Sequence, residues 1–192
     1  MTVWFTSDWH LFHDNILKLV PRPFKNVQQM HSVILANYRS CVREGDVVHF
    51  LGDLTLRGPS GIEAVRRLVG GLPGTKHFVL GNHDRLKVQS LLKMGFASVH
   101  SSLVLRHGSC QYLHVHDPDE DLNTGWSYAP RIICGHVHEK WRYRAEPRPA
   151  VNVGVDAWGF QPVRRHTVMT LFDNPPDSFR RMLVGNAADF AA

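Results

Sequence analysis

Acidic, histidine and asparagine residues follow the ends of five short apolar segments of this sequence. They occur in the blocks Asp8-Trp9-His10, Gly52-Asp53, Gly81-Asn82-His83-Asp84, His116-Asp117-Pro118 and Gly135-His136-Val137-His138. Carboxylate and imidazole ligands suit borderline divalent ions such as Mn, Fe or Zn, and the blocks contain no cysteine that would favour a soft metal. The residue types therefore predict a site for hard-to-borderline metal ions.

The spacing within the blocks predicts how ions would be shared. Residues separated by one position in an extended chain point to the same side, so Asp8 and His10 can bind one ion together. His136 and His138 can reach neighbouring ions in the same way. Two ions roughly 3.5–4 Å apart need a bridging carboxylate, and Asp53 is the free candidate. With the two aspartates and one hydroxide, two divalent ions leave a net charge of about +1, which favours a phosphate substrate.

Elements of regular structure must bring these blocks together. The apolar segments before and between them have the length and the β-branched or aromatic content of buried strands. Strands are expected over Val3–Ser7, Val47–Leu51, His77–Leu80, Tyr112–Val115, Ile132–Cys134 and Ala150–Val153, with a late strand over Thr167–Phe172. Open α/β sheets bind ligands beyond the carboxyl ends of their strands, so the blocks are expected to share one crevice.

Three helices are predicted between the early strands. The first runs from Val27 to Val42 and begins at a capping box formed by Asn26 and Gln29. A second capping box, Ser60 with Glu63, opens a helix that ends before Gly70-Gly71, and a third helix is expected over Leu86–Met94. Alternating strands and helices followed by strands and turns predict an α/β fold, a two-sheet mixed β-sandwich flanked by helices.

Composition limits the classes of protein to consider. The 192 residues suit one domain, expected over residues 1–173, with a C-terminal tail over 174–192 that packs on the domain or trails from it. The net charge of +5 favours an anionic partner such as a nucleotide, although a basic surface alone also accounts for it. Three cysteines, no secretory leader and no membrane-length apolar run predict free thiols in a cytoplasmic protein without a membrane partner.

The ordered blocks resemble those of the calcineurin-like metallophosphoesterase superfamily, whose pattern is D-x-H, G-D, G-N-H-D/E, H and G-H-x-H. All five blocks are present between Asp8 and His138. Segments Trp4–Ile16, Arg22–Phe24 and Val151–Val163 are also similar to a compact bacterial and phage group of that superfamily. The resemblance implies a two-sheet sandwich flanked by helices and a hydrolase of phosphate esters.

The resemblance also implies roles for single residues. Asp8, His10 and His138 would bind one metal, Asn82, His116 and His136 would bind the other, and Asp53 would bridge them. Asn82 and His83 would contact the substrate, and His83 would protonate the leaving oxygen with Asp84 as its orienting partner. The expected cofactors are two divalent ions, with Mn favoured and Fe, Zn or Ni as alternatives.

Several assignments stay open at this point. His114 and His116 lie on one face of a strand, and we choose His116 because it stands where the strand ends at Pro118. Arg57 and His13 follow the metal blocks closely enough to bind the substrate phosphate. For Arg57 a helix-start or surface contact is the competing interpretation. His49 and His77 on apolar strands are interpreted as core residues.

The expected function is phosphodiester hydrolysis by a metal-bound hydroxide, with 2′,3′-cyclic nucleotides as a candidate substrate and RNA ends as a further one. Aromatic stacking on a base by Trp9, Trp126 or Trp158 would support this, and core packing is the alternative for each. The competing functions are a phosphomonoesterase, including a protein phosphatase, and a non-catalytic metal-binding scaffold. A DNA nuclease is a further alternative, but such relatives usually carry additional domains. The oligomeric state is not predicted.

Overall fold

The computed structural model describes residues 1–56, 61–119 and 131–176 of the chain. Its first sheet has the strand order β10-β1-β2-β3-β4, and β1 to β4 run parallel while β10 is antiparallel to β1. These strands are β1 (Val3–Thr6), β2 (Val47–Leu51), β3 (Thr75–Val79), β4 (Phe96–His100) and β10 (Val163–Arg164).

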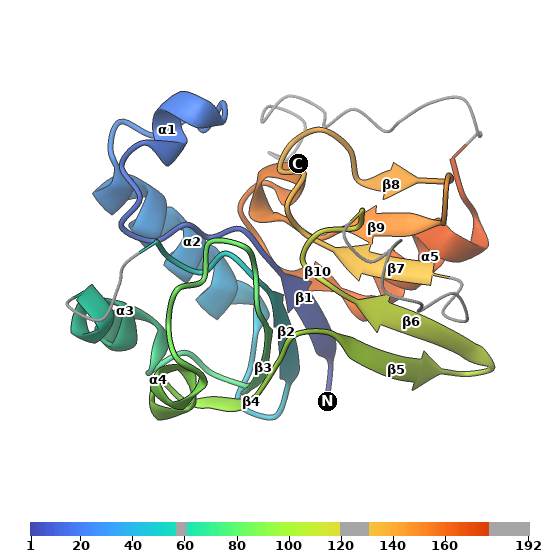
Figure 1. Cartoon of the computed structure of the whole chain (residues 1–192), viewed down its shortest axis with the longest axis horizontal. Helices are drawn as coiled ribbons and strands as arrows, with labels where there is room; N and C mark the ends of the chain where they lie inside the picture. Colours follow the sequence, from blue (N-terminus) through green and yellow to red (C-terminus); the bar gives the residue numbers. More distant parts are fainter. Residues whose placement is uncertain (57–60, 120–130, 177–192) are drawn as a thin grey trace.

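The second sheet is also mixed. Its order is β5-β6-β7-β9-β8, in which β6, β7 and β9 run parallel and the outer strands β5 and β8 are antiparallel to their neighbours. These strands are β5 (Leu103–His107), β6 (Cys110–His114), β7 (Arg131–Cys134), β8 (Tyr143–Arg144) and β9 (Ala150–Asn152). The predicted two-sheet mixed sandwich is confirmed (Figure 1).

Helices flank the two sheets, and most of them cover the outer face of the first sheet (Figure 1). They are α1 (Ile16–Leu19), α2 (Val27–Cys41), α3 (Ile62–Val69), α4 (Val88–Lys93), the short 3-10 helix η3 (Val155–Trp158) and α5 (Arg165–Asp173). The Asn26 side chain accepts a hydrogen bond from the backbone N–H of Gln29 at 2.9 Å, as the predicted cap of α2 requires. The carboxylate of Glu63 instead pairs with Arg66, and Ser60 lies outside the described residues.

Alternation along the strands divides the apolar residues among three layers. In β1, Trp4 faces the helices while Phe5 faces the second sheet. In β7, Ile133 faces the first sheet while Ile132 packs on the opposite side. Successive residues of a strand point to opposite faces, so a strand that is buried on both faces contributes apolar side chains to two layers. Packing of these side chains in the central layer holds the two sheets together.

One predicted strand is wrong. Residues Thr167–Phe172 belong to helix α5, whose buried residues are Val168, Met169 and Phe172. Val168 and Met169 are adjacent and Phe172 follows three positions later, which places all three on one face of the helix. The β-branched residues of the segment had favoured a strand. Tertiary packing therefore overrides the local preference.

The described part of the chain ends shortly after helix α5, and its cysteines are not paired. Helix α5 ends at Asp173, and residues 177–192 of the expected tail lie outside the described part of the chain. Cys41, Cys110 and Cys134 are free thiols, as predicted. Within the described residues, no helix has the length and apolar character needed to cross a membrane.

Candidate metal centre and active site

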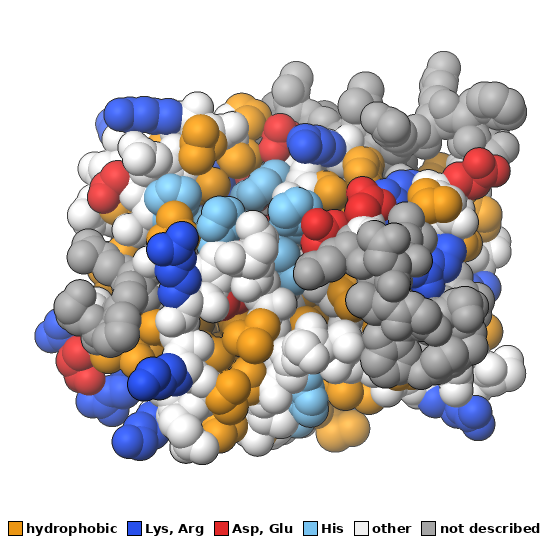
Figure 2. Space-filling view, viewed as in Figure 1, with side chains coloured by type: hydrophobic (Ala, Val, Ile, Leu, Met, Phe, Trp, Pro, Cys, Tyr) orange, Lys and Arg blue, Asp and Glu red, His pale blue; other side chains and the backbone are white. Residues whose placement is uncertain are grey.

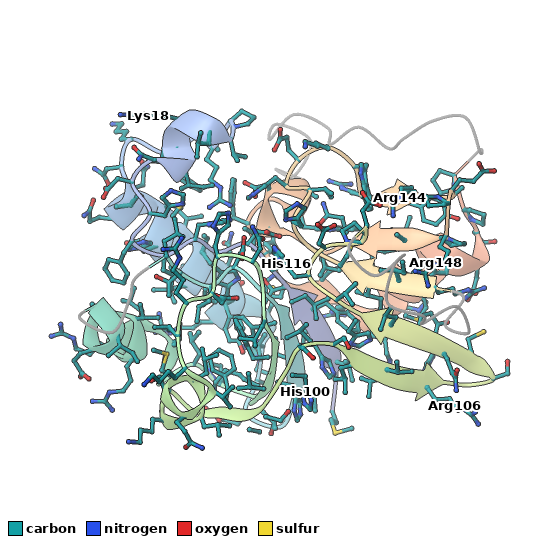
Figure 3. The ribbon with its side chains drawn as sticks, viewed as in Figure 1. Lys18, His100, Arg106, His116, Arg144 and Arg148 are labelled. Atoms are coloured by element: carbon teal, nitrogen blue, oxygen red, sulfur yellow. The ribbon has the colours of Figure 1, made fainter. Side chains whose placement is uncertain are left out.

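The carboxyl ends of parallel strands from both sheets meet at one edge of the sandwich. An isolated parallel bridge between Ser7, after β1, and Gly154, after β9, joins the two sheets there. Figure 3 shows His116 at this junction, and Figure 2 shows histidine side chains gathered on the same face. Side chains from the strand-end blocks therefore lie close together at this edge.

The first group of candidate ligands consists of Asp8, His10 and His138. One ligand atom from each lies within 4.8 Å of the others. The side chains of Asp8 and His10 are buried, and neither ring nitrogen of His10 has a hydrogen-bond partner among the described residues. Burial lowers the pKa of His10 to about 2, so its imidazole is neutral and free to donate a lone pair.

The second group consists of Asp8, Asp53 and His116, again with ligand atoms within 4.8 Å of one another. Nδ1 of His116 donates to the backbone carbonyl of Leu51 at 2.7 Å, which directs Nε2 toward the carboxylates. Burial lowers the pKa of His116, but the hydrogen bond to Asp53 and the charges of Asp8 and Asp53 outweigh it and raise the pKa to about 9. The carboxylates thus attract positive charge to this position.

Asn82 and His136 lie beside the second group. Oδ1 of Asn82 is 3.3 Å from Nδ1 of His136, so the two atoms that could bind an ion already face each other. The backbone N–H of His136 lies 3.1 Å from both carboxylate oxygens of Asp8. Nε2 of His136 is 3.6 Å from Oδ2 of Asp117, which places a carboxylate on the far side of this ring.

Asp53 belongs to the second group and also faces the first. Its Oδ2 atom is 3.5 Å from Nε2 of His10 and 3.2 Å from Nε2 of His116. Its Oδ1 atom accepts a hydrogen bond from the backbone N–H of His83 at 3.0 Å. One carboxylate oxygen therefore faces an imidazole of each group.

His83 and His13 flank the same centre. The ring of His10 lies 5.7 Å from the ring of His83 and 5.5 Å from that of His13, measured between centroids. Both residues are half-buried, so part of each is accessible to solvent. Arg57 lies outside the described residues, and its expected contact with phosphate stays a prediction.

Asp84 has a different set of contacts from the one expected. Its carboxylate accepts hydrogen bonds from the backbone N–H groups of Asp53 at 2.7 Å, Leu54 at 3.0 Å and Gly81 at 2.8 Å. The carboxylate thus joins the loop that carries Asp53 to the loop that carries His83. The role that these contacts support is the fixing of two loops and not the orientation of the His83 imidazole.

Four further sequence expectations concern His114 and three tryptophans. His114 packs against Phe5 and His49 between the sheets, whereas His116 reaches the carboxylates. Trp9 is buried in the core and donates to Thr6, so the structure contradicts a stacking role for it. Trp158 donates to the carbonyl of Asn152 and packs in the central layer, and Trp126 lies outside the described residues.

The backbone at the candidate ligands is unusual. Five of the seven have positive φ angles, a conformation that costs of order 1 kcal/mol or more for a residue other than glycine. They are Asp8 (60°), His10 (48°), Asp53 (55°), His136 (70°) and His138 (51°). Such strain persists only where the surroundings determine the conformation, and it concentrates at functional sites.

Sequence analysis did not single out Asp156, which follows β9 on η3. Its Oδ2 atom accepts a hydrogen bond from Nδ1 of His138 at 2.8 Å, so Nε2 of that ring is left for a ligand. The sequence feature that could have identified Asp156 is its position after the sixth predicted strand, four residues beyond Asn152. That signal is weak because an acidic residue in a turn is common.

The donor set fits divalent metal ions. The site contains the buried carboxylates of Asp8 and Asp53, the buried imidazole of His10 with both nitrogens unpaired, and the imidazole of His116 beside Asp53. Without a cation, the burial of these charged and polar groups would be energetically costly. Oxygen and imidazole donors are those that Mn, Fe and Zn accept. The residues present therefore match a metal-dependent site.

The family model described as calcineurin-like phosphoesterase matches residues 1–188. The chain belongs to this family. It is therefore a metal-dependent phosphoesterase, a hydrolase of phosphoric esters whose substrate is a phosphate ester.

Similar proteins extend this comparison over most of the chain. A protein of Methanocaldococcus jannaschii described as uncharacterised is 30% identical over 178 residues, which cover 89% of this chain and 91% of that protein. The gene 66 protein of Mycobacterium phage L5 is 27% identical and covers 81% of this chain and 87% of its own length. A protein of unknown function from Aquifex aeolicus has a crystal structure with a TM-score of 0.69 and 25% identity, covering 88% and 98% of the two chains.

A glycine at the site gives a direct test of the close packing. A Cβ atom on Gly135 would collide with the hydroxyl of Ser7 and would lie 2.6 Å from Oδ2 of Asp8, so Gly135→Ala must displace both side chains. We expect metal affinity to fall roughly 10–100-fold, the range seen when ligand-orienting groups are lost. Calorimetric titration with Mn measures it. Gly71→Ala is the matched control, because nothing lies within 4 Å of its added Cβ, and equal affinity of the two variants would contradict the prediction.

Proposed function

We propose that the site binds two divalent ions and hydrolyses phosphodiesters of nucleotides. Asp8, His10 and His138 are assigned to the first ion, and Asn82, His116 and His136 to the second. The observation that carries the assignment is the position of Asp53 Oδ2, at 3.5 Å from His10 and 3.2 Å from His116. A single oxygen facing both groups is what a bridging carboxylate provides.

Mn is the favoured metal, with Fe, Zn or Ni as alternatives. When bound, such ions polarise phosphoryl oxygens and lower the pKa of coordinated water. The chain's own contribution is to hold the ligands in place before the ions arrive. Leu51 fixes the ring of His116, and Asp84 fixes the loop that carries Asp53.

His83 is proposed as the general acid. Its backbone N–H is bonded to Asp53, which fixes the residue beside the metal centre, and its side chain is half-buried. A protonated imidazole there would donate to the oxygen that leaves phosphorus. General acids of this kind typically contribute about 10²–10⁴-fold to the rate.

The leaving group and the charge of the chain are compatible with the proposed diester substrate. The leaving oxygen of an alkyl ester is a poor leaving group, so a positioned acid such as His83 contributes most to its hydrolysis. The net charge of +5 favours an anionic substrate such as a nucleotide or an RNA end. A 2′,3′-cyclic nucleotide is the proposed substrate, because its strained five-membered ring reacts readily without elaborate recognition of the base.

The substrate proposal is tested by kcat/KM values measured in one buffer with Mn. The set consists of matched phosphomonoesters, linear diesters, and 2′,3′- and 3′,5′-cyclic nucleotides. We expect diesters to be preferred and the 2′,3′-cyclic compounds to react fastest. A clear preference for monoesters over every diester would contradict the proposal and indicate a general phosphatase.

Substitution of the bridging residue tests the dinuclear assignment. Asp53→Asn keeps the shape of the side chain but removes the charge that both ions would share, so we expect fewer than two ions per chain and an activity loss of orders of magnitude. Metal analysis and turnover are measured together. Asp173→Asn is the control, because Asp173 is paired with Arg131 on the surface. A variant with Asn at 53 that binds two ions and keeps wild-type turnover would exclude the bridge.

The acid is tested separately from the metal centre. His83→Ala should retain two ions, and its rate should fall most for esters with poor leaving groups, because good leaving groups need no proton. Turnover of an alkyl and a nitrophenyl diester of the same nucleotide provides the comparison. Equal loss on both would indicate that His83 positions phosphate and does not act as the acid.

A further inference from the structure

Arg22 and Asp156 form a buried ion pair next to the proposed first metal site. Nε of Arg22 lies 2.7 Å from Oδ1 of Asp156, and Nη2 lies 2.8 Å from Oδ2. The two side chains are 0% and 3% exposed, and the residues are 134 positions apart in the sequence. This two-pronged geometry fixes both side chains relative to each other.

The guanidinium continues from this pair to the loop that carries Asp8 and His10. Nη2 of Arg22 donates to the backbone carbonyl of Asp8 at 2.7 Å, and Nη1 donates to that of Trp9 at 3.3 Å. Both candidate ligands have positive φ angles, 60° and 48°. The arginine therefore contacts the strained peptides whose conformation determines where the two ligands point.

The carboxylate continues from the same pair to the third ligand. Oδ2 of Asp156 accepts from Nδ1 of His138 at 2.8 Å. This hydrogen bond fixes the ring and its tautomer, with Nε2 left on the side of Asp8 and His10. One ion pair thus contacts both chain segments that supply the first group of ligands.

The ligands proposed for the second ion, Asn82, His116 and His136, depend on other contacts. His116 is held by the carbonyl of Leu51, and Nδ1 of His136 lies 3.3 Å from Asn82. No hydrogen bond from Arg22 or Asp156 to those residues is present among the described residues. A ligand atom of Asp8 also lies within 4.8 Å of those of Asp53 and His116, but Arg22 contacts Asp8 only at its backbone carbonyl. The ion pair is therefore placed to act mainly on the ligands proposed for the first ion.

We propose that Arg22 and Asp156 are positioning residues for the Asp8–His10–His138 metal site. The inference rests on the proposed two-ion assignment. We therefore expect that loss of the ion pair weakens the binding of one ion and leaves the binding of the other unchanged. A purely structural ion pair would instead lower stability without discriminating between the two ions.

The experiment compares Mn binding by titration calorimetry and metal analysis in the full chain. Asp156→Asn keeps the size of the side chain but removes its charge, and Arg22→Met keeps length without the two-pronged donors. His138→Ala serves as the reference for loss of the first ion, and His136→Ala serves as the reference for loss of the second ion in the same measurement. Asp173→Asn, which breaks the surface pair with Arg131, is the control.

We expect the wild-type chain and the control to bind two ions. Asp156→Asn and Arg22→Met should each weaken one ion by about 10–100-fold and resemble His138→Ala and not His136→Ala. The double variant Arg22→Met, Asp156→Leu removes both buried charges together and should recover thermal stability, because apolar pairs can replace buried ion pairs. Its affinity for the first ion should nevertheless stay low. That result would distinguish a positioning role of the ion pair from a role in folding stability.

Three results would overturn the inference. Wild-type affinity for both ions in the folded single or double variants would show that the pair is only structural. Equal weakening of both ions would show that its effect is not local. A wild-type chain that fails to bind two ions would contradict the proposed function itself, and the inference with it, before any variant is compared.

Discussion

The buried carboxylates of Asp8 and Asp53 impose the constraint on which the rest of the site depends. Both lie at the carboxyl ends of adjacent parallel strands, and both are almost completely removed from solvent. Buried charges are costly unless they are paired or coordinate a metal. The imidazoles of His10, His116 and His138 gather around them, and together they form a donor set that a divalent cation satisfies.

The surrounding fold holds this arrangement in conformations that the chain would not otherwise adopt. Positive φ angles occur at five of the candidate ligands, and the neighbouring contacts explain how they persist. Loop residues 8–11 and 53–54 are joined by backbone hydrogen bonds, and Asp84 caps the second of these loops. Gly135 passes so close to Asp8 that a side chain there would displace the carboxylate. Strain at the ligands is thus balanced by contacts from the loops around them.

The interior of the fold and most of the candidate site were predictable from the sequence. The six predicted strands that are correct correspond to β1, β2, β3, β6, β7 and β9, which all lie inside their sheets. The four that were missed, β4, β5, β8 and β10, are the edge strands. Edge strands such as β5, with three half-buried and two exposed residues, lack the continuous apolar run of a strand covered on both faces. The pattern of buried residues therefore identifies the strands that position the site and not those that border it.

Contacts between side chains distant in sequence were not predictable. Asp84 was expected to orient His83, yet its oxygens accept backbone N–H groups from the neighbouring loop. The pairing of Arg22 with Asp156 depends on the docking of the two sheets, which no local pattern encodes.

An anomalous diffraction map of crystals loaded with Mn would locate the bound ions. We expect two peaks roughly 3.5–4 Å apart on either side of the Asp53 carboxylate. One of them should contact Asp8, His10 and His138, and the other Asn82, His116 and His136. A single peak, or peaks that do not share Asp53, would contradict a two-ion centre bridged by Asp53.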